Sequence, residues 1–83
     1  MGFVESKRTQ KAIRTNCRYR VLSCLKRAGL RGLTDEEIQQ RLNMDGNTER
    51  PRRRELEESG KVRRSGDQRK TRSGHFASVW VAA

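Results

Sequence analysis

The stretch GLTDEEIQQRL, residues 32–42, contains the clearest helix start in the chain. Thr34 and Glu37 have the spacing of a capping box, in which each side chain bonds to the other residue's backbone amide. Leu33 and Ile38 have the spacing of a hydrophobic staple. The three acids after Thr34 also suit the positive end of a helix dipole. The sequence therefore predicts a helix that begins at Thr34 and runs to the end of this stretch.

A second helix is expected after a very short connection. NMDGN has the Asn, Asp and Gly residues of a tight turn. The following NTERPRRRELEESGKV predicts a helix over residues 47–59, with Asn47 as its N-cap, Leu56 on the buried side and Gly60 at its end. Pro51 is compatible with a helix only near its first turn. Two helices joined this closely are typical of a helix-turn-helix.

Residues 16–28 predict an earlier helix, because Val21, Leu25 and Ala28 share one face at helical spacing. Asn16 is its expected N-cap, and Gly29 stands where a helix commonly ends. Residues 1–15 are polar and basic, and two readings stay open for them: a basic arm or a backward extension of this helix. An extension would put four bases on one stripe, at Lys7, Lys11, Arg14 and Arg18.

The C-terminal part of the chain predicts a β-hairpin. KVRRS and FASVWVA are short β-prone runs, and GDQRKTRSG, residues 66–74, lies between them as a long loop rich in turn formers and bases. Gly66 and Gly74 bound this loop. Trp80 is expected to pack the hairpin against the helices.

Length and charge limit the possibilities further. A chain of 83 residues has room for one small domain, here residues 16–83, preceded by residues 1–15. The net charge of +10, from 20 Lys and Arg against 10 Asp and Glu, indicates a polyanionic partner. Nucleic acid, an anionic membrane or an acidic protein would each satisfy the charge. No apolar run approaches the roughly 18 residues that a membrane span needs.

Enzymatic and metal chemistry are not expected. Cys17 and Cys24 would lie about 10 Å apart along one helix, too far for a disulfide, and are expected to be free thiols. Together with His75, the only histidine, they are too few for a zinc site. No nucleophile, metalloprotease or phosphate-loop motif is present. We therefore expect no enzyme activity and no cofactor.

The order helix, helix, tight turn, helix, hairpin resembles the winged helix-turn-helix family, in particular its compact bacterial and phage DNA-binding proteins of MarR-like type. GLTDEEIQQRL, NTERPRRRELEESGKV and SVWVA carry this resemblance. It implies an α+β, mainly α fold of three helices followed by a β-hairpin wing. It also implies double-stranded DNA as the partner, a cytoplasmic, nucleoid-associated location, and a third helix that enters the major groove.

With Leu56 at the centre of the buried face, helical stepping places Asn47, Arg50, Pro51, Arg54 and Glu58 outward. We expect Arg50 and Arg54 to present bidentate donors to guanines. Asn47 or Thr48 would meet an adjacent base or a phosphate. The flanking Arg52 and Arg53 are expected to contact phosphates.

An alternative is that these four arginines only pair with the glutamates of the same helix. Against it, the bases crowd the N-terminal half, which the helix dipole disfavours, so stability alone would not select this order. Glu49 and Arg53 stand where related recognition helices have apolar residues, and we expect these two to neutralise each other.

The resemblance also assigns roles outside this helix. In the wing, Arg69, Lys70 and Arg72 would lie on the DNA backbone or in the minor groove, and the hydroxyls of Thr71 and Ser73 would donate to phosphates. A flexible, solvated loop is the alternative. The stripe Lys7, Lys11, Arg14 and Arg18 would add backbone contacts. A Z-DNA-type contact by Trp80 is disfavoured, because the expected recognition helix has no tyrosine.

The predicted function is that of a small transcriptional regulator or recombination accessory factor, acting alone, as a homodimer or with other DNA-bound proteins. The alternative is a winged-helix protein–protein interaction module with only non-specific nucleic-acid affinity. RNA is a weaker candidate, because aromatic residues, which stack on single-stranded bases, make up only 5% of the chain.

Overall fold

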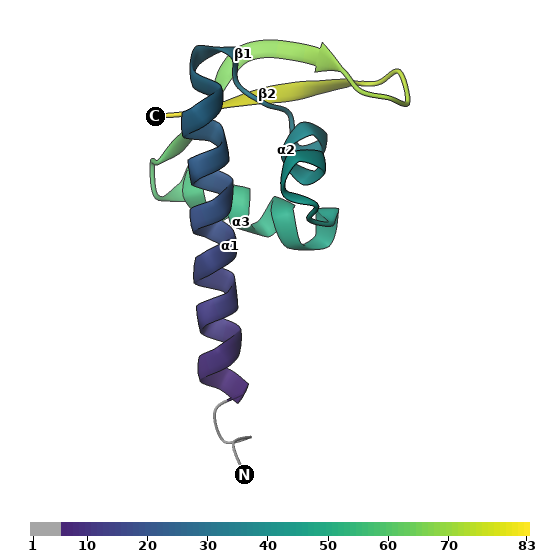
Figure 1. Cartoon of the computed structure of the whole chain (residues 1–83). Coiled ribbons are helices and arrows are strands. Elements are labelled where there is room, and N and C mark those ends of the chain that lie inside the picture. The colour runs from purple at the N-terminus through teal and green to yellow at the C-terminus, as the bar shows by residue number, and fades with distance from the viewer. Residues whose placement is uncertain (1–5) are drawn as a thin grey trace.

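The computed structural model describes the backbone of residues 6–83 and the side chains of residues 14–83. The elements are α1 (Ser6–Ala28), the short 3-10 helix η2 (Gly29–Arg31), α2 (Asp35–Leu42), α3 (Gly46–Glu58), β1 (Val62–Lys70) and β2 (Phe76–Ala82). The two strands form an antiparallel hairpin (Figure 1). Three α-helices followed by a hairpin confirm the predicted winged-helix-like α+β fold.

The first helix is longer at its N-terminal end than residues 16–28. α1 already contains Ser6, so the extension, and not a separate arm, accounts for residues 6–15. Asn16 lies inside the helix, and its expected role as N-cap is wrong. The physical reason is that residues 6–15 contain no Gly or Pro and are rich in good helix formers. The N-terminal half of α1 projects beyond the rest of the fold (Figure 1).

The start of α2 is as predicted. The amide of Glu37 donates to Oγ1 of Thr34 at 3.2 Å, and the amide of Thr34 donates to Oε1 of Glu37 at 3.0 Å, which completes the capping box. Asn43 ends the helix in the left-handed conformation, with φ of 51°. This residue turns the chain toward α3.

The start of α3 differs from the prediction. Asp45, not Asn47, is the N-cap, and its Oδ1 accepts a hydrogen bond from the amide of Thr48 at 2.8 Å. Asp and Asn are equally good N-caps, so the local sequence offers two starts, two residues apart. Because the earlier one is used, Pro51 lies in the second turn, where its missing N–H leaves the carbonyl of Asn47 without its helical partner.

The hairpin is more extended than predicted. β1 continues to Lys70, and residues 71–75 alone connect the strands, so the expected loop over residues 66–74 is wrong. Arg64 pairs with Trp80 and Gln68 pairs with Ser78, so residues 65–67 lie opposite a single residue of β2. This bulge, with Gly66 at φ of 96°, absorbs the turn-forming residues inside the strand.

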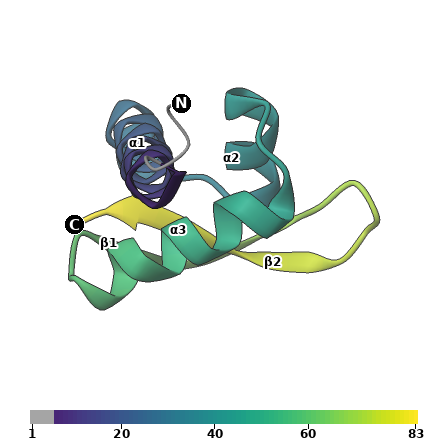
Figure 2. The same ribbon diagram turned by 90° about the horizontal axis from the view of Figure 1, so that it is seen from below.

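The core lies where all the elements meet, and Trp80 is at its centre. Trp80 is 3% exposed and exchanges two backbone hydrogen bonds with Leu33, at 2.8 and 2.9 Å, which fasten the hairpin to the start of α2. The prediction that it packs the hairpin against the helices is confirmed. Viewed along α1, α3 runs from beside α2 to beneath α1, in front of the hairpin (Figure 2). The other fully or nearly fully buried side chains of this cluster are Val21, Leu25, Leu33, Ile38, Leu56 and Val62.

Candidate nucleic-acid interface

The four arginines of α3 fall into two structurally different pairs. Arg53 belongs to the inner pair. Its Nε and Nη2 donate to Oδ1 and Oδ2 of Asp35 in α2, at 3.0 and 2.8 Å. Its Nη1 donates to Glu57 at 3.2 Å, and its guanidinium lies 4.1 Å from the centre of the Trp80 ring. Arg53 therefore joins α2, α3 and the hairpin.

This arrangement changes two expectations. The side chain of Arg53 is only 12% exposed and each of its three nitrogens already donates to a carboxylate, so it is not placed to contact a phosphate. Arg53 also does not form the expected ion pair with Glu49. Arg53 makes its ion pairs with Asp35 and Glu57. Sequence spacing could not show this, because Asp35 is 18 residues away and on another helix.

The side chain of Glu49, in α3, is completely buried. Its Oε1 accepts a hydrogen bond from the side-chain amide Nε2 of Gln39 at 2.9 Å, while Oε2 has no hydrogen-bond partner. Burial and the neighbouring Asp35 carboxyl raise the pKa of Glu49 to about 8. Burial acts to raise the pKa of Asp35, but the net shift is downward, because the hydrogen bonds and charge of Arg53 and the adjacent Glu49 carboxyl act to lower it. Glu49 is thus a protonated acid at neutral pH, in a position facing the core.

Arg52 is the second member of the inner pair. Its Nη2 donates to Oε2 of Glu55 at 2.9 Å, its side chain is 13% exposed, and its Nε is buried with no partner. It was expected to contact phosphates, and its side chain lies against α3 instead. The alternative of pairing within the helix therefore describes Arg52 well.

Arg50 and Arg54 form the outer pair and lie on the predicted outward face. Both are exposed, and neither forms an ion pair with any side chain of residues 14–83. They are four residues apart, one helical turn. Asn47 and Glu58 on the same face are exposed as well. Thr48 is half-buried near the capped first turn. The rotation of α3 inferred from Leu56, which is 4% exposed, thus agrees with the structure.

Gly46 leaves room for Arg50. A Cβ atom at Gly46 would lie 2.9 Å from Nη1 of Arg50, closer than such contacts normally are. The guanidinium of Arg50 therefore folds back over the first turn of α3. Arg50 lies in the N-terminal half of α3, and Arg54 lies one turn further along the helix.

The hairpin is anchored to the first turn of α2. Nη1 of Arg69 donates to Oε1 of Glu37, and its Nη2 donates to the carbonyl oxygen of Arg31 at 2.9 Å. The backbone amide of Arg72 donates to Oε1 of Glu36 at 3.3 Å. Arg69 is therefore occupied within the fold, in contrast to its expected role in contacting DNA.

The tip of the hairpin carries two exposed basic side chains. The side chains of Lys70 and Arg72 are exposed and form no ion pair with residues 14–83. The hydroxyls of Thr71 and Ser73 lie 3.0 Å apart, and that of Ser73 is 3.1 Å from Nδ1 of His75. Residues 72–75 are exposed, and the bond from the amide of Arg72 to Glu36 ties this tip to α2, so the solvated-loop alternative stays open for the side chains.

The acids of α2 were the functional residues that sequence reasoning missed. Asp35 and Glu37 were attributed to the capping box and the helix dipole alone. In the structure they also hold one arginine of α3 and one of the hairpin. One sequence signal points to these ion pairs. The first turn of α2 is acidic, and both α3 and the hairpin are rich in arginine, so ion pairs between these elements are favoured. The sequence does not say which arginines pair.

Net charge is distributed unevenly over the elements. α1 contains eight Lys and Arg and no acid, whereas α3 contains four arginines and four glutamates. Residues 61–83 contain six Lys and Arg and one acid. Excess positive charge therefore lies on α1 and the hairpin, while α3 is neutral overall and exposes Arg50 and Arg54 along its middle.

The predicted stripe on α1 has the helical backbone that it needs, since α1 spans all four positions. Arg14 is exposed, and Arg18 lies 3.7 Å from Glu55 in an ion pair with both side chains more than one third exposed. The side chains of Lys7 and Lys11 lie outside the described part of the chain.

Other chemistry is not organised in the part of the chain that the structure describes. Cys17 and Cys24 are free thiols, and no group of three or more His, Cys, Asp or Glu side chains among the described residues is arranged to hold a metal ion. None of the described helices could span a bilayer. Trp80 is too deeply buried to stack on a base.

Comparison of the chain with protein-family models, with curated proteins and with solved structures found no match.

Proposed function

We propose that this chain is a double-stranded DNA-binding protein that reads the major groove with α3 and acts as a small transcriptional regulator or recombination accessory factor. The observation that carries the proposal is the outer pair, Arg50 and Arg54, exposed and unpaired on a helix whose other two arginines are used internally.

The outer pair suits base recognition. Guanidinium groups bind guanine O6 and N7 in a bidentate manner, and each such contact discriminates by about 1–3 kcal/mol. A recognition helix contacts base edges mainly with its N-terminal residues. Arg50 lies in the N-terminal half of α3, and Arg54 lies one turn further along the same face. Asn47, exposed at the leading end, extends the same face.

Phosphate contacts would come from other elements. The acid-free helix α1 and the exposed Lys70 and Arg72 at the hairpin tip carry the charge that attracts a duplex. Contacts of this kind position a protein without reading sequence, and they make affinity fall steeply with salt. Such binding would make this a nucleoid-associated protein. Arg52, Arg53 and Arg69 are left out of the proposed interface because the fold already uses them.

A second candidate function is a protein–protein interaction module with only non-specific affinity for nucleic acid. The overall neutrality of α3 favours it, since the excess charge on α1 and the hairpin would bind any polyanion. Both candidates predict DNA binding at low salt. They differ in sequence preference.

Selection from a pool of random duplexes, followed by sequencing, separates the two. The proposed function predicts an enriched sequence motif at physiological salt, and a palindromic motif would indicate that two copies bind together. Recovery of unenriched sequences, with binding lost as salt rises, would support the interaction module and contradict base reading by α3.

A further inference from the structure

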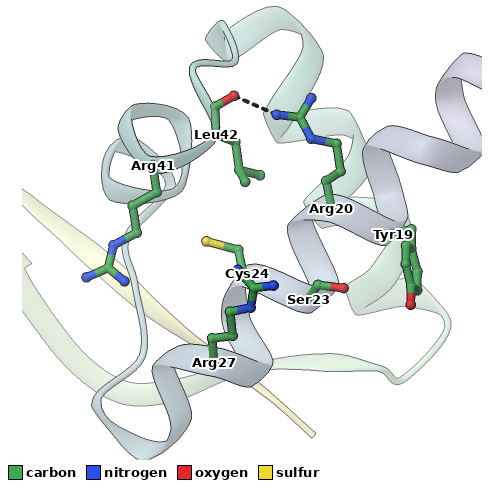
Figure 3. A pocket seen from close by; sticks show the side chains of 7 residues that line it. All are labelled: Tyr19, Arg20, Ser23, Cys24, Arg27, Arg41 and Leu42. Atoms are coloured by element: carbon green, nitrogen blue, oxygen red, sulfur yellow. Dashed lines mark hydrogen bonds between the residues drawn. The ribbon is translucent and has the colours of Figure 1, made fainter.

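A hollow of about 380 Å³ lies between α1 and α2, and none of its lining residues belongs to α3 (Figure 3). Its lining includes Arg20 and Arg27 from α1 and Arg41 from α2. Cys24 and Leu42 form its inner surface. None of these five residues belongs to α3 or to the hairpin, and none has been named individually in the proposed DNA interface. The volume is within the range of pockets that hold small ligands.

The hollow is positively charged and contains no compensating acid. Its lining includes three arginines and neither an aspartate nor a glutamate. Nη2 of Arg20 donates to the carbonyl oxygen of Leu42 at 2.8 Å, which holds that guanidinium at the end of α2. Arg27 and Arg41 form no ion pair with any side chain of residues 14–83. Three like charges around one space repel each other unless an anion enters.

The inner surface is much less polar than the rim. Cys24 is 8% exposed and belongs to the hydrophobic core, and Leu42 packs against that core. Burial raises the pKa of the Cys24 thiol even though Arg41 and Arg27 act to lower it, so the thiol remains neutral. Tyr19, which is 70% exposed, adds an aromatic ring at the edge. Charged donors thus surround an apolar base.

We infer that this hollow binds a small organic anion in which a phosphate or carboxylate group is joined to an apolar body. Guanidinium groups donate in pairs to both kinds of oxyanion, and Arg27 and Arg41 have donors to spare. The apolar body would cover Cys24 and Leu42. This site is separate from the outward face of α3, so the inference does not depend on DNA binding.

The test is a titration of the full chain with phenyl phosphate, followed through the amide NMR signals. Saturable shifts are expected at Ser23, Cys24 and Arg41. Arg27→Gln and Arg41→Gln should each weaken binding about tenfold, as expected for loss of a charge-assisted hydrogen bond. Arg63→Gln is the matched control, since it removes the same charge from an exposed position on β1. The spectrum of each variant reports whether it folds.

Two further titrations identify what the hollow recognises. Inorganic phosphate should bind more weakly than phenyl phosphate, and equal affinity would overturn the apolar part of the inference. A DNA duplex should leave phenyl phosphate binding intact. Competition at Ser23 and Cys24 would show that the hollow takes backbone phosphates, and would overturn the small-ligand assignment. Shifts spread over all the basic surfaces, or an equal loss in Arg63→Gln, would overturn it as well.

Discussion

Arg53 of α3 and Asp35 of α2 form a bidentate ion pair, with N–O distances of 3.0 and 2.8 Å. The neighbouring Arg54 is exposed and has no such partner among the described residues. Adjacent arginines on one helix thus have opposite relationships to the fold. This contrast separates the arginine that holds α3 in place from the one that is proposed to contact a duplex.

Arg53→Ala should lower the free energy of unfolding by about 2–3 kcal/mol, because it removes charged hydrogen bonds and leaves the part-buried Asp35 unpaired. Arg54→Ala should change it by less than about 0.5 kcal/mol. Urea denaturation of the two variants and the native chain measures both values. If the two substitutions destabilised the fold equally, the assignment of Arg53 to the inner pair would be wrong.

Stability should fall as pH rises, through Glu49. Its pKa is raised from 4.5 to about 8 in the folded protein, so the folded state holds a proton that the unfolded chain releases between those values. The contribution is fully present below pH 4.5 and is lost as pH rises to about 8. The pKa of Asp35 is lowered instead, so its own contribution is lost at the acid end.

Glu49→Gln should remove this loss, because an amide keeps the buried position neutral at every pH. Urea titrations near pH 5, 7 and 9 should show the variant gaining on the native chain as pH rises. Glu58→Gln, at an exposed position of the same helix, serves as the control and should leave the slope unchanged. Parallel curves for the native chain and Glu49→Gln would contradict a protonated Glu49.

The two arginines of the hairpin should behave differently. Arg72→Ala should weaken binding to all duplexes alike and reduce the slope of log affinity against log salt by about 0.9, the value for one phosphate contact. Arg69→Ala should mainly loosen the hairpin, because it breaks the bonds to Glu37 and Arg31. Salt-dependent fluorescence anisotropy and amide hydrogen exchange in β1 measure these effects. A larger change in salt slope for Arg69→Ala would reverse the assignment.

Helix α1 should contribute affinity without sequence preference. Arg14 is exposed on a helix that has no acid. Arg14→Gln should therefore lower affinity for selected and random duplexes by the same factor, since phosphate contacts carry no sequence information. Anisotropy titrations with both duplexes give that factor. A loss confined to the selected duplex would place Arg14 among the base-reading residues.

Features set by local sequence were predictable. The capping box of Thr34 and Glu37 depends on residues three apart, and the outward position of Arg54 follows from Leu56 and helical geometry. The sequence did not distinguish Asp45 from Asn47 as the N-cap of α3, because Asp and Asn have equal N-cap propensity. The extent of β1 was missed because a bulge at Gly66 places turn-forming residues inside a strand.

Features set by packing between elements were not predictable. The pairing of Arg53 with Asp35 and of Arg69 with Glu37 joins residues 18 and 32 positions apart. Which arginines form ion pairs with these acids depends on how the elements pack in the folded chain. The hollow lined by Arg27 and Arg41 likewise forms because two helices lie together. Sequence spacing identified the outward face of α3. The tertiary contacts then showed that only Arg50 and Arg54, of its four arginines, have no ion-pair partner among the described residues.

The most direct test of base reading by α3 compares affinities for a selected duplex and a scrambled duplex at physiological salt, for the native chain, Arg50→Ala and Arg54→Ala. The account predicts that each substitution lowers the ratio of the two affinities by the equivalent of about 1–3 kcal/mol and changes binding to the scrambled duplex much less. An unchanged ratio in both variants, with affinity for the two duplexes reduced equally, would contradict it.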